Sequence, residues 1–394
     1  MELVMALNYA IAFFTLFTVN VLILLFLKHR GDCLKKPKRS NWEPTVSIVM
    51  PAYNEGEYLA KCIESVLAVD YPTRKLDILV VDDGSTDNTL AVARRFEGGP
   101  VRIFTKKNEG KGAALNFGIS KARGELLATM DADSYLTKNT LKDLLPYFED
   151  PEVMAVTPAV KIRESSSWLK EFQRVEYLMI LFSRKLLSFI DSVPVTPGPF
   201  SIFRTKVFKE VGGFDEHNLV EDQEIALRIQ SHNYKIRSSL SADVYTEPPH
   251  EVKSLLHQRV RWQRGGLRNY WRYSFMIKPE YGDFGMYFVP LNFATIIAFF
   301  LVLGLMINVL LSTPVYIGYI WANVLGFNIS MFTFIGAFVV IASTIFLYLA
   351  LKSFDNEKVR LRYILSFIVF YWFLAVGYNV ITLFKELRRD KSSW

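Results

Sequence analysis

Two pairs of acidic residues directly follow short sequence segments that are rich in strand-forming residues. Asp82 and Asp83 follow one such segment, and Asp131 and Asp133 follow another. Carboxylates one residue apart on a turn suit a hard divalent cation such as Mg²⁺ or Mn²⁺, which proteins usually hold with one or two carboxylates and a substrate's phosphates. Asp131 and Asp133 are therefore candidate metal ligands, although an Asp-rich segment can also be an ordinary turn.

Two further groups of polar residues follow later and could serve the same substrate. Asp222, beside Glu221, would have a raised pKa in a shielded cleft and could accept a proton from a hydroxyl group. Alternatively, the two acids could mark a helix start, where acids are common. The segment 258–262, Gln-Arg-Val-Arg-Trp, offers guanidinium groups for phosphate oxygens and a flat indole face for a sugar ring.

Lys111 adds a cation to the same region. It lies in the segment 108–112, Asn-Glu-Gly-Lys-Gly, which opens an expected helix, so backbone N–H groups and the ammonium can meet an anion there. The spacing of a P-loop is absent, which argues against phosphate hydrolysis of the kinase or ATPase type. The five histidines show no metal-ligand spacing, and Cys33 and Cys62 imply no disulfide framework.

The elements that must position these residues alternate between strand and helix. Strand patterns are expected at residues 45–50, 77–81, 101–104 and 125–130, and helical patterns at 56–67, 86–96 and 112–122. This alternation predicts an α/β fold with a mostly parallel sheet and helices on both faces. Because ligands of open α/β sheets bind beyond the carboxyl ends of the strands, both acidic motifs should share one crevice.

Long apolar runs flank this α/β region. Hydrophobic residues make up 51% of the 394 residues, and residues 6–27, 287–311, 315–351 and 363–384 contain no charged residue. About 20 apolar residues suffice to cross a bilayer as a helix, so we expect these runs to be transmembrane. The first run is interpreted as an anchor, because the features of a cleaved signal peptide are missing. Residues 315–351 could cross once or twice.

The basic residues orient the chain and limit its partners. Lysines and arginines between residues 28 and 39 follow the first apolar run, and the positive-inside rule places residues 45–285 in the cytoplasm. The net charge of +7 is attributed to attraction by anionic lipid headgroups, and no nucleic-acid binding is expected. A transporter or channel is a further alternative, but the apolar spans lack the charged residues that commonly mark a substrate or ion pathway.

The ordered motifs resemble those of family 2 glycosyltransferases. The resemblance covers roughly residues 45–275 and rests on residues 51–55, 82–85, 108–112, 131–133, 221–222 and 258–262. More narrowly, Gly198 and Pro199 before Phe200, and a Gln-x-x-Arg-Trp motif followed by apolar runs, are similar to processive synthases of hyaluronan, chitin, poly-N-acetylglucosamine and cellulose.

The resemblance implies a role for each matching residue. The nucleotide-sugar donor would be bound by Tyr53, Glu55, Asp82, Asp83, Lys111, Asp131, Gln258, Arg259 and Arg261. Asp133, helped by Asp131, would hold Mg²⁺ or Mn²⁺, and Asp222 would be the catalytic base. The acceptor would be bound by Trp262, Gly198 and Pro199.

The resulting hypothesis is a membrane-bound, metal-dependent, inverting glycosyltransferase of GT-A fold. It would transfer a hexose or N-acetylhexosamine from a nucleotide sugar, with UDP as the expected nucleotide, to a growing β-linked polysaccharide and assist its export. The alternative is a single transfer to a lipid acceptor in the membrane. The expected organisation is a transmembrane helix (1–27), a basic cytosolic linker (28–44), a cytosolic GT-A domain (45–250), an amphipathic interface helix (251–285) and a transmembrane bundle (286–394). Residues 168–190 are expected to lie along the membrane interface as well.

Overall fold

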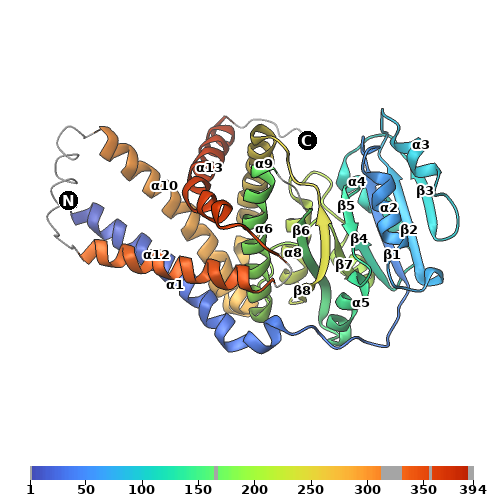
Figure 1. Cartoon of the computed structure of the whole chain (residues 1–394), viewed down its shortest axis with the longest axis horizontal. Helices are drawn as coiled ribbons and strands as arrows, with labels where there is room; N and C mark the ends of the chain where they lie inside the picture. Colours follow the sequence, from blue (N-terminus) through green and yellow to red (C-terminus); the bar gives the residue numbers. More distant parts are fainter. Residues whose placement is uncertain (1, 164–166, 312–330, 355–356, 389–394) are drawn as a thin grey trace.

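The computed structural model consists of an α/β unit from which long apolar helices project on one side (Figure 1). It describes residues 2–163, 167–311, 331–354 and 357–388. Within these residues the strands form one eight-stranded sheet in the order β3-β2-β1-β4-β7-β6-β8-β5. The strands are β1 Val46–Ala52, β2 Leu76–Asp82, β3 Val101–Thr105, β4 Leu126–Thr129, β5 Ser134–Leu136, β6 Val153–Ile162, β7 Ser201–Arg204 and β8 Lys235–Thr246.

The first four strands are parallel, as the alternating pattern predicts. β2 and β4 both pair with β1, and β3 pairs with β2. β7 then runs antiparallel to both β4 and β6, whereas β6 and β8 are parallel and β5 is antiparallel to β8. The predicted mixed, mostly parallel sheet is therefore confirmed.

Helices cover both faces of the parallel strands. Along β1, Ile48 faces a core shared with α2, while Val49 faces the opposite core beneath α4, as the two-residue period of a strand requires. A Cβ on Gly118 of α4 would lie 2.3 Å from Val49 Cγ1, so a glycine lets this helix approach the strand closely. The helices of the α/β unit are α2 Leu59–Leu67, α3 Thr89–Arg94, α4 Lys111–Lys121, α5 Thr140–Leu144, α6 Trp168–Leu187, α7 Lys206–Val211, α8 Glu221–Ser231 and α9 Val252–Arg272.

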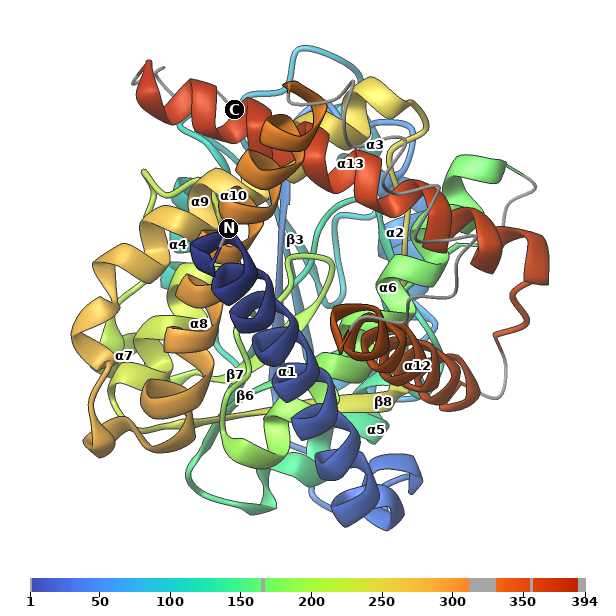
Figure 2. The same ribbon diagram turned by 90° about the vertical axis from the view of Figure 1, so that its left-hand side faces the viewer.

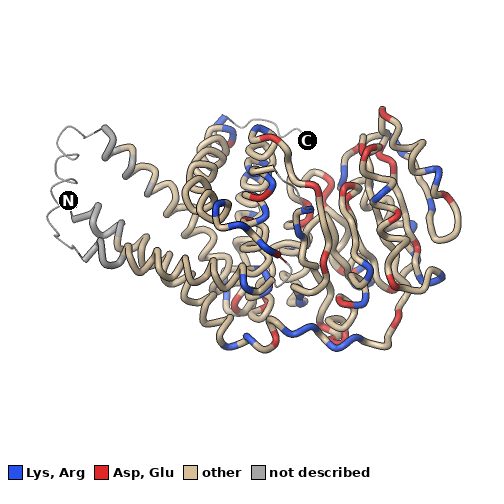
Figure 3. The backbone as a smooth tube through the Cα atoms, viewed as in Figure 1, with Lys and Arg blue, Asp and Glu red and all other residues tan. Residues whose placement is uncertain are grey.

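The apolar helices project away from the sheet and carry few charges (Figures 1 and 3). They are α1 Glu2–Leu34, α10 Val289–Leu311, α12 Met331–Lys352 and α13 Leu361–Leu387. Among the described residues, three helices are long and apolar enough to cross a membrane: Tyr9–Leu34, Phe284–Leu301 and Leu361–Leu387. The chain is therefore a membrane protein. Part of the expected run 315–351 lies outside the described residues, and its remainder is the single helix α12.

Short helical turns connect the longer elements. The 3-10 turns are η1 Thr73–Lys75, η2 Leu145–Glu149, η3 Ser188–Ile190, η4 Ser274–Met276 and η5 Pro279–Tyr281, and η6 Phe284–Phe288 is a π-helical turn leading into α10.

Helix α6 lies between the sheet and the apolar helices (Figures 1 and 2). On it, the Phe182 ring lies 5.4 Å from Phe26 of α1 and 5.3 Å from Phe346 of α12, and the Phe172 ring lies 5.4 Å from Phe367 of α13. Aromatic contacts of this kind attach the membrane helices to the α/β unit.

The first helix is longer than the apolar run that predicts it. It bends at His29, whose φ is −110°, and continues to Leu34, so the first residues of the expected linker 28–44 are helical. The difference arises because a charge pattern marks the end of an apolar run, whereas the helix ends only where its backbone hydrogen bonds end.

Candidate active site

The two acidic motifs lie at the same edge of the sheet. β2 ends at Asp82, which pairs in register with Ala52 of β1, and Asp131 follows the end of β4 on the other side of β1. The carboxyl ends of parallel strands thus bring them into one region, as expected.

Asp82 and Asp83 are both buried, and both carboxylates accept hydrogen bonds from other residues of the chain. Asp82 accepts hydrogen bonds from Thr105 Oγ1 and the backbone N–H of Ser85. Asp83 accepts hydrogen bonds from Lys106 Nζ at 2.9 Å and from the backbone N–H of Gly110 at 2.8 Å. These carboxylates fix the loop that leads into α4, so they position Lys111 at the start of that helix.

Lys111 is the cation at the centre of the site. Its ammonium lies 2.7 Å from Asp131 and 3.1 Å from Glu221, and it thereby joins the end of β4 to the start of α8. Burial by itself would lower the pKa of Lys111, but the two carboxylates outweigh burial and raise it. Lys111 is therefore held as a cation, with 27% of its side chain exposed.

Gly198 connects the candidate metal ligand with the candidate base. Its carbonyl accepts the backbone N–H of Asp131 at 3.1 Å, and its own N–H donates to Asp222 Oδ2 at 3.3 Å. A Cβ at this position would lie 2.7 Å from both Asp131 Oδ2 and Lys111 Nζ. Only glycine fits between these groups without displacing them.

The cleft disfavours full ionisation of its carboxyl groups. Burial and the neighbouring Glu221 raise the pKa of Asp222, while Lys111 and Arg261 oppose that shift. Burial and Asp131 likewise raise the pKa of Asp133. The pKa of Glu55 is raised to about 7 by burial, with Asp133 and Asp131 as the next largest causes. Several carboxyl groups with raised pKa values in one cleft are typical of a functional site.

Asp131 and Asp133 form a pair of carboxylates that repel one another. Within the described residues, no group of three or more His, Cys, Asp or Glu side chains is arranged to hold a metal ion. A pair nevertheless fits Mg²⁺ or Mn²⁺, because such ions take their remaining ligands from phosphates and water.

The segment 258–262 lies on α9, and its two arginines differ in their contacts. Arg261 Nη1 donates to the carbonyl of Leu219, just before α8, and its charge acts on Asp222. The Arg259 guanidinium instead forms a buried ion pair with Glu176 of α6 and lies 4.2 Å from the centre of the Trp262 ring. This guanidinium is enclosed and already neutralised, and its expected role as a phosphate ligand stays a prediction.

The remaining predicted residues show fewer contacts. Gln258 accepts a hydrogen bond from Arg259 Nη1. Tyr53 is exposed on the loop after β1, and Pro199 is half-buried beside Gly198. The roles of these residues stay predictions.

Sequence reasoning missed Glu176. Its neighbourhood was interpreted as an interface helix, yet Glu176 is buried and its carboxylate receives two hydrogen bonds from Arg259. An acid between Val175 and Tyr177 is the signal that could have revealed it, because a buried acid needs a cationic partner.

Comparison with solved structures places the fold. The chain aligns over 89% of its length with all of a mannosyltransferase from Pyrobaculum calidifontis, solved in complex with GDP-mannose and Mn²⁺, with a TM-score of 0.63 and 19% identity. The expected GT-A fold is therefore confirmed.

Sequence comparisons identify the class of enzyme. Residues 47–212 match the family model "Glycosyl transferase family 2", and this match together with the synthase relatives below indicates a glycosyltransferase. The chain is 26% identical over 361 residues to a poly-β-1,6-N-acetyl-D-glucosamine synthase of Staphylococcus epidermidis, and this alignment covers 89% of this chain and 85% of that protein. The synthase of the same description from Staphylococcus aureus (strain COL) is 29% identical over 225 residues, 56% of this chain and 54% of that protein.

Proposed function

We propose that this protein extends a β-linked polysaccharide of N-acetylglucosamine, using a UDP-linked donor at the cytoplasmic face of a membrane. The observation that carries the proposal is the geometry around Gly198, which joins the Asp131 backbone to the Asp222 carboxylate beside the Lys111 ammonium. This arrangement supports the proposal, because it would set a cation for a diphosphate next to a base for an acceptor hydroxyl. The similarity to two poly-N-acetylglucosamine synthases supports a polymer product over a lipid-linked one.

In the proposed reaction, Asp222 acts as the general base. It takes the proton of the acceptor hydroxyl while that oxygen forms a bond to the anomeric carbon of the donor sugar. The bond from the same carbon to the diphosphate breaks, and attack from the opposite face inverts the configuration. The raised pKa of Asp222 suits this task, since a stronger base accepts the proton more readily.

Lys111 and Arg261 would stabilise the departing diphosphate. Both charges act on Asp222, so they lie near the place where negative charge develops. Asp131 and Asp133 would hold Mg²⁺ or Mn²⁺, which supplies further positive charge to a diphosphate when it is bound. Lys111 would exchange part of its contact with Asp131 for a phosphate oxygen as the donor enters.

Trp262 is proposed to support the terminal sugar of the acceptor. Its half-buried indole is fixed by the Arg259 guanidinium, which in turn is fixed by Glu176. A rigid aromatic face of this kind restricts the orientation of the sugar and thereby its attacking hydroxyl.

A donor screen tests the proposal. Purified full-length protein is incubated with Mn²⁺ or Mg²⁺ and, separately, UDP-N-acetylglucosamine, UDP-glucose or GDP-mannose. We expect incorporation of sugar from UDP-N-acetylglucosamine and loss of that incorporation when the metal is chelated. Equal use of GDP-mannose, or transfer without any divalent cation, would contradict the proposal.

A further inference from the structure

A second region of the α/β unit gathers positive charge around a cavity where α1 ends. The cavity has a volume of about 450 Å³ and is enclosed by the chain leaving α1, by η2, by the end of α6 with η3, and by the start of β8. Its cationic side chains are Lys35, Lys36, Lys38, Lys185 and Arg237, and Asp32 is the one acid among its described lining residues.

Lys185 is a buried cation in this cavity, and an anion bound nearby would stabilise it. Only 4% of this residue is exposed, and its ammonium lies 5.1 Å from the centre of the Tyr147 ring and 4.9 Å from that of Phe189. Its hydrogen bond to Tyr147 Oη is long, at 3.4 Å. In the described part of the chain no carboxylate lies within ion-pair distance of Lys185. Aromatic rings offset only part of the cost of burying a cation, so an anion in the cavity would stabilise it.

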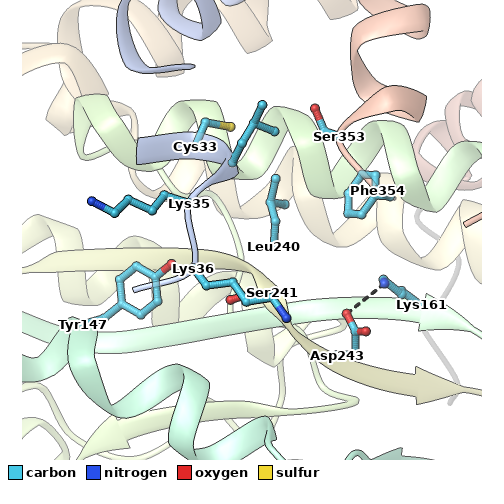
Figure 4. Close-up of a pocket in the computed structure, with 11 residues that line it drawn as sticks. Cys33, Lys35, Lys36, Tyr147, Lys161, Leu240, Ser241, Asp243, Ser353 and Phe354 are labelled. Carbon is cyan, nitrogen blue, oxygen red and sulfur yellow. Dashed lines mark ion pairs between the residues drawn. The ribbon is translucent and has the colours of Figure 1, made fainter. Parts of the chain in front are cut away.

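The neighbouring cationic side chains leave most of the positive charge of the cavity uncompensated. Arg237 is paired with Asp191 and also donates to the carbonyl of Ser188. Lys35 and Lys36 form no ion pair with any residue that the structure describes, and both are exposed. The same two lysines reach a smaller cavity next to this one, where Lys161 is already paired with Asp243 (Figure 4). The smaller cavity thus already contains a carboxylate paired with its buried lysine, whereas Lys185 in the larger cavity has no such partner among the described residues.

The cavity is remote from the candidate active site. Arg237 lies near the start of β8, whereas Thr246 at its end pairs with Ser134, next to Asp133. The partners of Arg237 and Thr246 on β6 are Val156 and Ile162, and these six residues of strand at ~3.3 Å each correspond to roughly 20 Å. The cavity and the candidate active site therefore lie at opposite ends of β8.

The position of the cavity indicates which anion would occupy it. α1 is a candidate membrane span up to Leu34, and Lys35 follows directly, so the cavity opens where such a helix leaves the bilayer. The His29 ring stacks on Phe189 at 4.4 Å, which fixes this end of α1 against η3. Basic pockets beside membrane helices on the cytoplasmic side bind anionic lipid headgroups.

We propose that this cavity binds the phosphate-bearing headgroup of an anionic phospholipid and so anchors the α/β unit at the membrane surface. Lys35 and Lys36 contact the phosphate from the solvent side, and Lys185 contacts it from within. The site is independent of the sugar donor and of the polymer made.

Native mass spectrometry of full-length protein, purified and delipidated in a neutral detergent, tests this proposal. The protein is titrated with phosphatidylglycerol or phosphatidylcholine. We expect one saturable phosphatidylglycerol site and no saturable phosphatidylcholine site. The variant Lys35→Gln/Lys36→Gln should bind phosphatidylglycerol roughly 25-fold more weakly, since each lysine near an anionic surface contributes about a factor of five.

A matched variant provides the control. Lys206→Gln/Lys209→Gln removes the same charge from the exposed side of α7 and should keep the affinity of the original protein within about twofold. Unchanged binding by Lys35→Gln/Lys36→Gln, or an equal loss in the control, would overturn the site. Displacement of the lipid by an equimolar amount of inorganic phosphate would overturn the assignment to a lipid headgroup.

Discussion

Neutralising Glu176 should impair use of the acceptor without impairing use of the donor. Glu176 and Arg259 are each 4% exposed, and two hydrogen bonds join them, one of 3.1 Å from Arg259 Nε. Breaking a buried ion pair costs about 3–5 kcal/mol. In Glu176→Gln the amide oxygen can still accept one of the two hydrogen bonds, so we expect about 2 kcal/mol of local destabilisation.

This local loss should appear at Trp262. The Arg259 guanidinium lies 4.2 Å from the indole centre, a contact worth about 0.5–2 kcal/mol that depends on the orientation set by Glu176. If the indole supports the acceptor sugar, kcat/KM for an oligosaccharide acceptor should fall by about 10- to 100-fold, because each 1.4 kcal/mol corresponds to a factor of about ten. The affinity for UDP should change by less than about twofold.

Steady-state transfer at varied acceptor concentration, together with calorimetric titration of UDP, provides the assay. Glu386→Gln is the matched control, because Glu386 pairs with Arg264 and Arg268 of the same helix α9 but contacts neither Gln258 nor Trp262 in the described interactions. Equal losses of donor and acceptor binding in Glu176→Gln would refute the reasoning, as would full activity. Glu176→Asp, which keeps the charge, should recover part of the acceptor kcat/KM.

Further predictions concern the cleft itself. Asp222→Asn should bind UDP normally while turnover falls by roughly 10²-fold or more. An unchanged kcat would show that another residue is the general base. Asp133→Asn should abolish the metal dependence of UDP binding, which calorimetry with and without Mn²⁺ would show. Gly198→Ala should reduce turnover by at least about 10-fold, because a Cβ there would lie 2.7 Å from Lys111 Nζ; wild-type rates in this variant would mean that the cleft can widen at no cost. Transfer should be lost as the pH falls through the pKa of Asp222, because the protonated carboxyl group cannot accept a proton. Since this pKa is raised, the midpoint of the acid side of a plot of kcat against pH should lie above about 3.9, the pKa of an ordinary Asp carboxyl.

The parallel strands and their acidic ends could be predicted because they depend on local patterns. β1, β2 and β4 follow from short apolar runs, and Asp131 follows from its place after one of them. The shared edge of the sheet then results from a general rule of open α/β sheets.

Contacts between distant segments could not be predicted in this way. Arg259 and Glu176 are 83 residues apart in the chain, and no periodicity of either helix shows that they meet. The same holds for Gly198, whose place between Asp131 and Asp222 depends on how β7 and α8 pack. A motif indicates which residue types are present, but only the folded chain shows that Arg259 is neutralised by another side chain.

The length of the product tests the central claim most directly. Purified protein is supplied with radiolabelled UDP-N-acetylglucosamine and Mn²⁺, and the product is sized and then treated with an enzyme that cleaves β-linked poly-N-acetylglucosamine. The account predicts a high-molecular-weight product that this treatment degrades and that Asp222→Asn protein fails to make. Label confined to a single sugar on an organic-soluble lipid would contradict it.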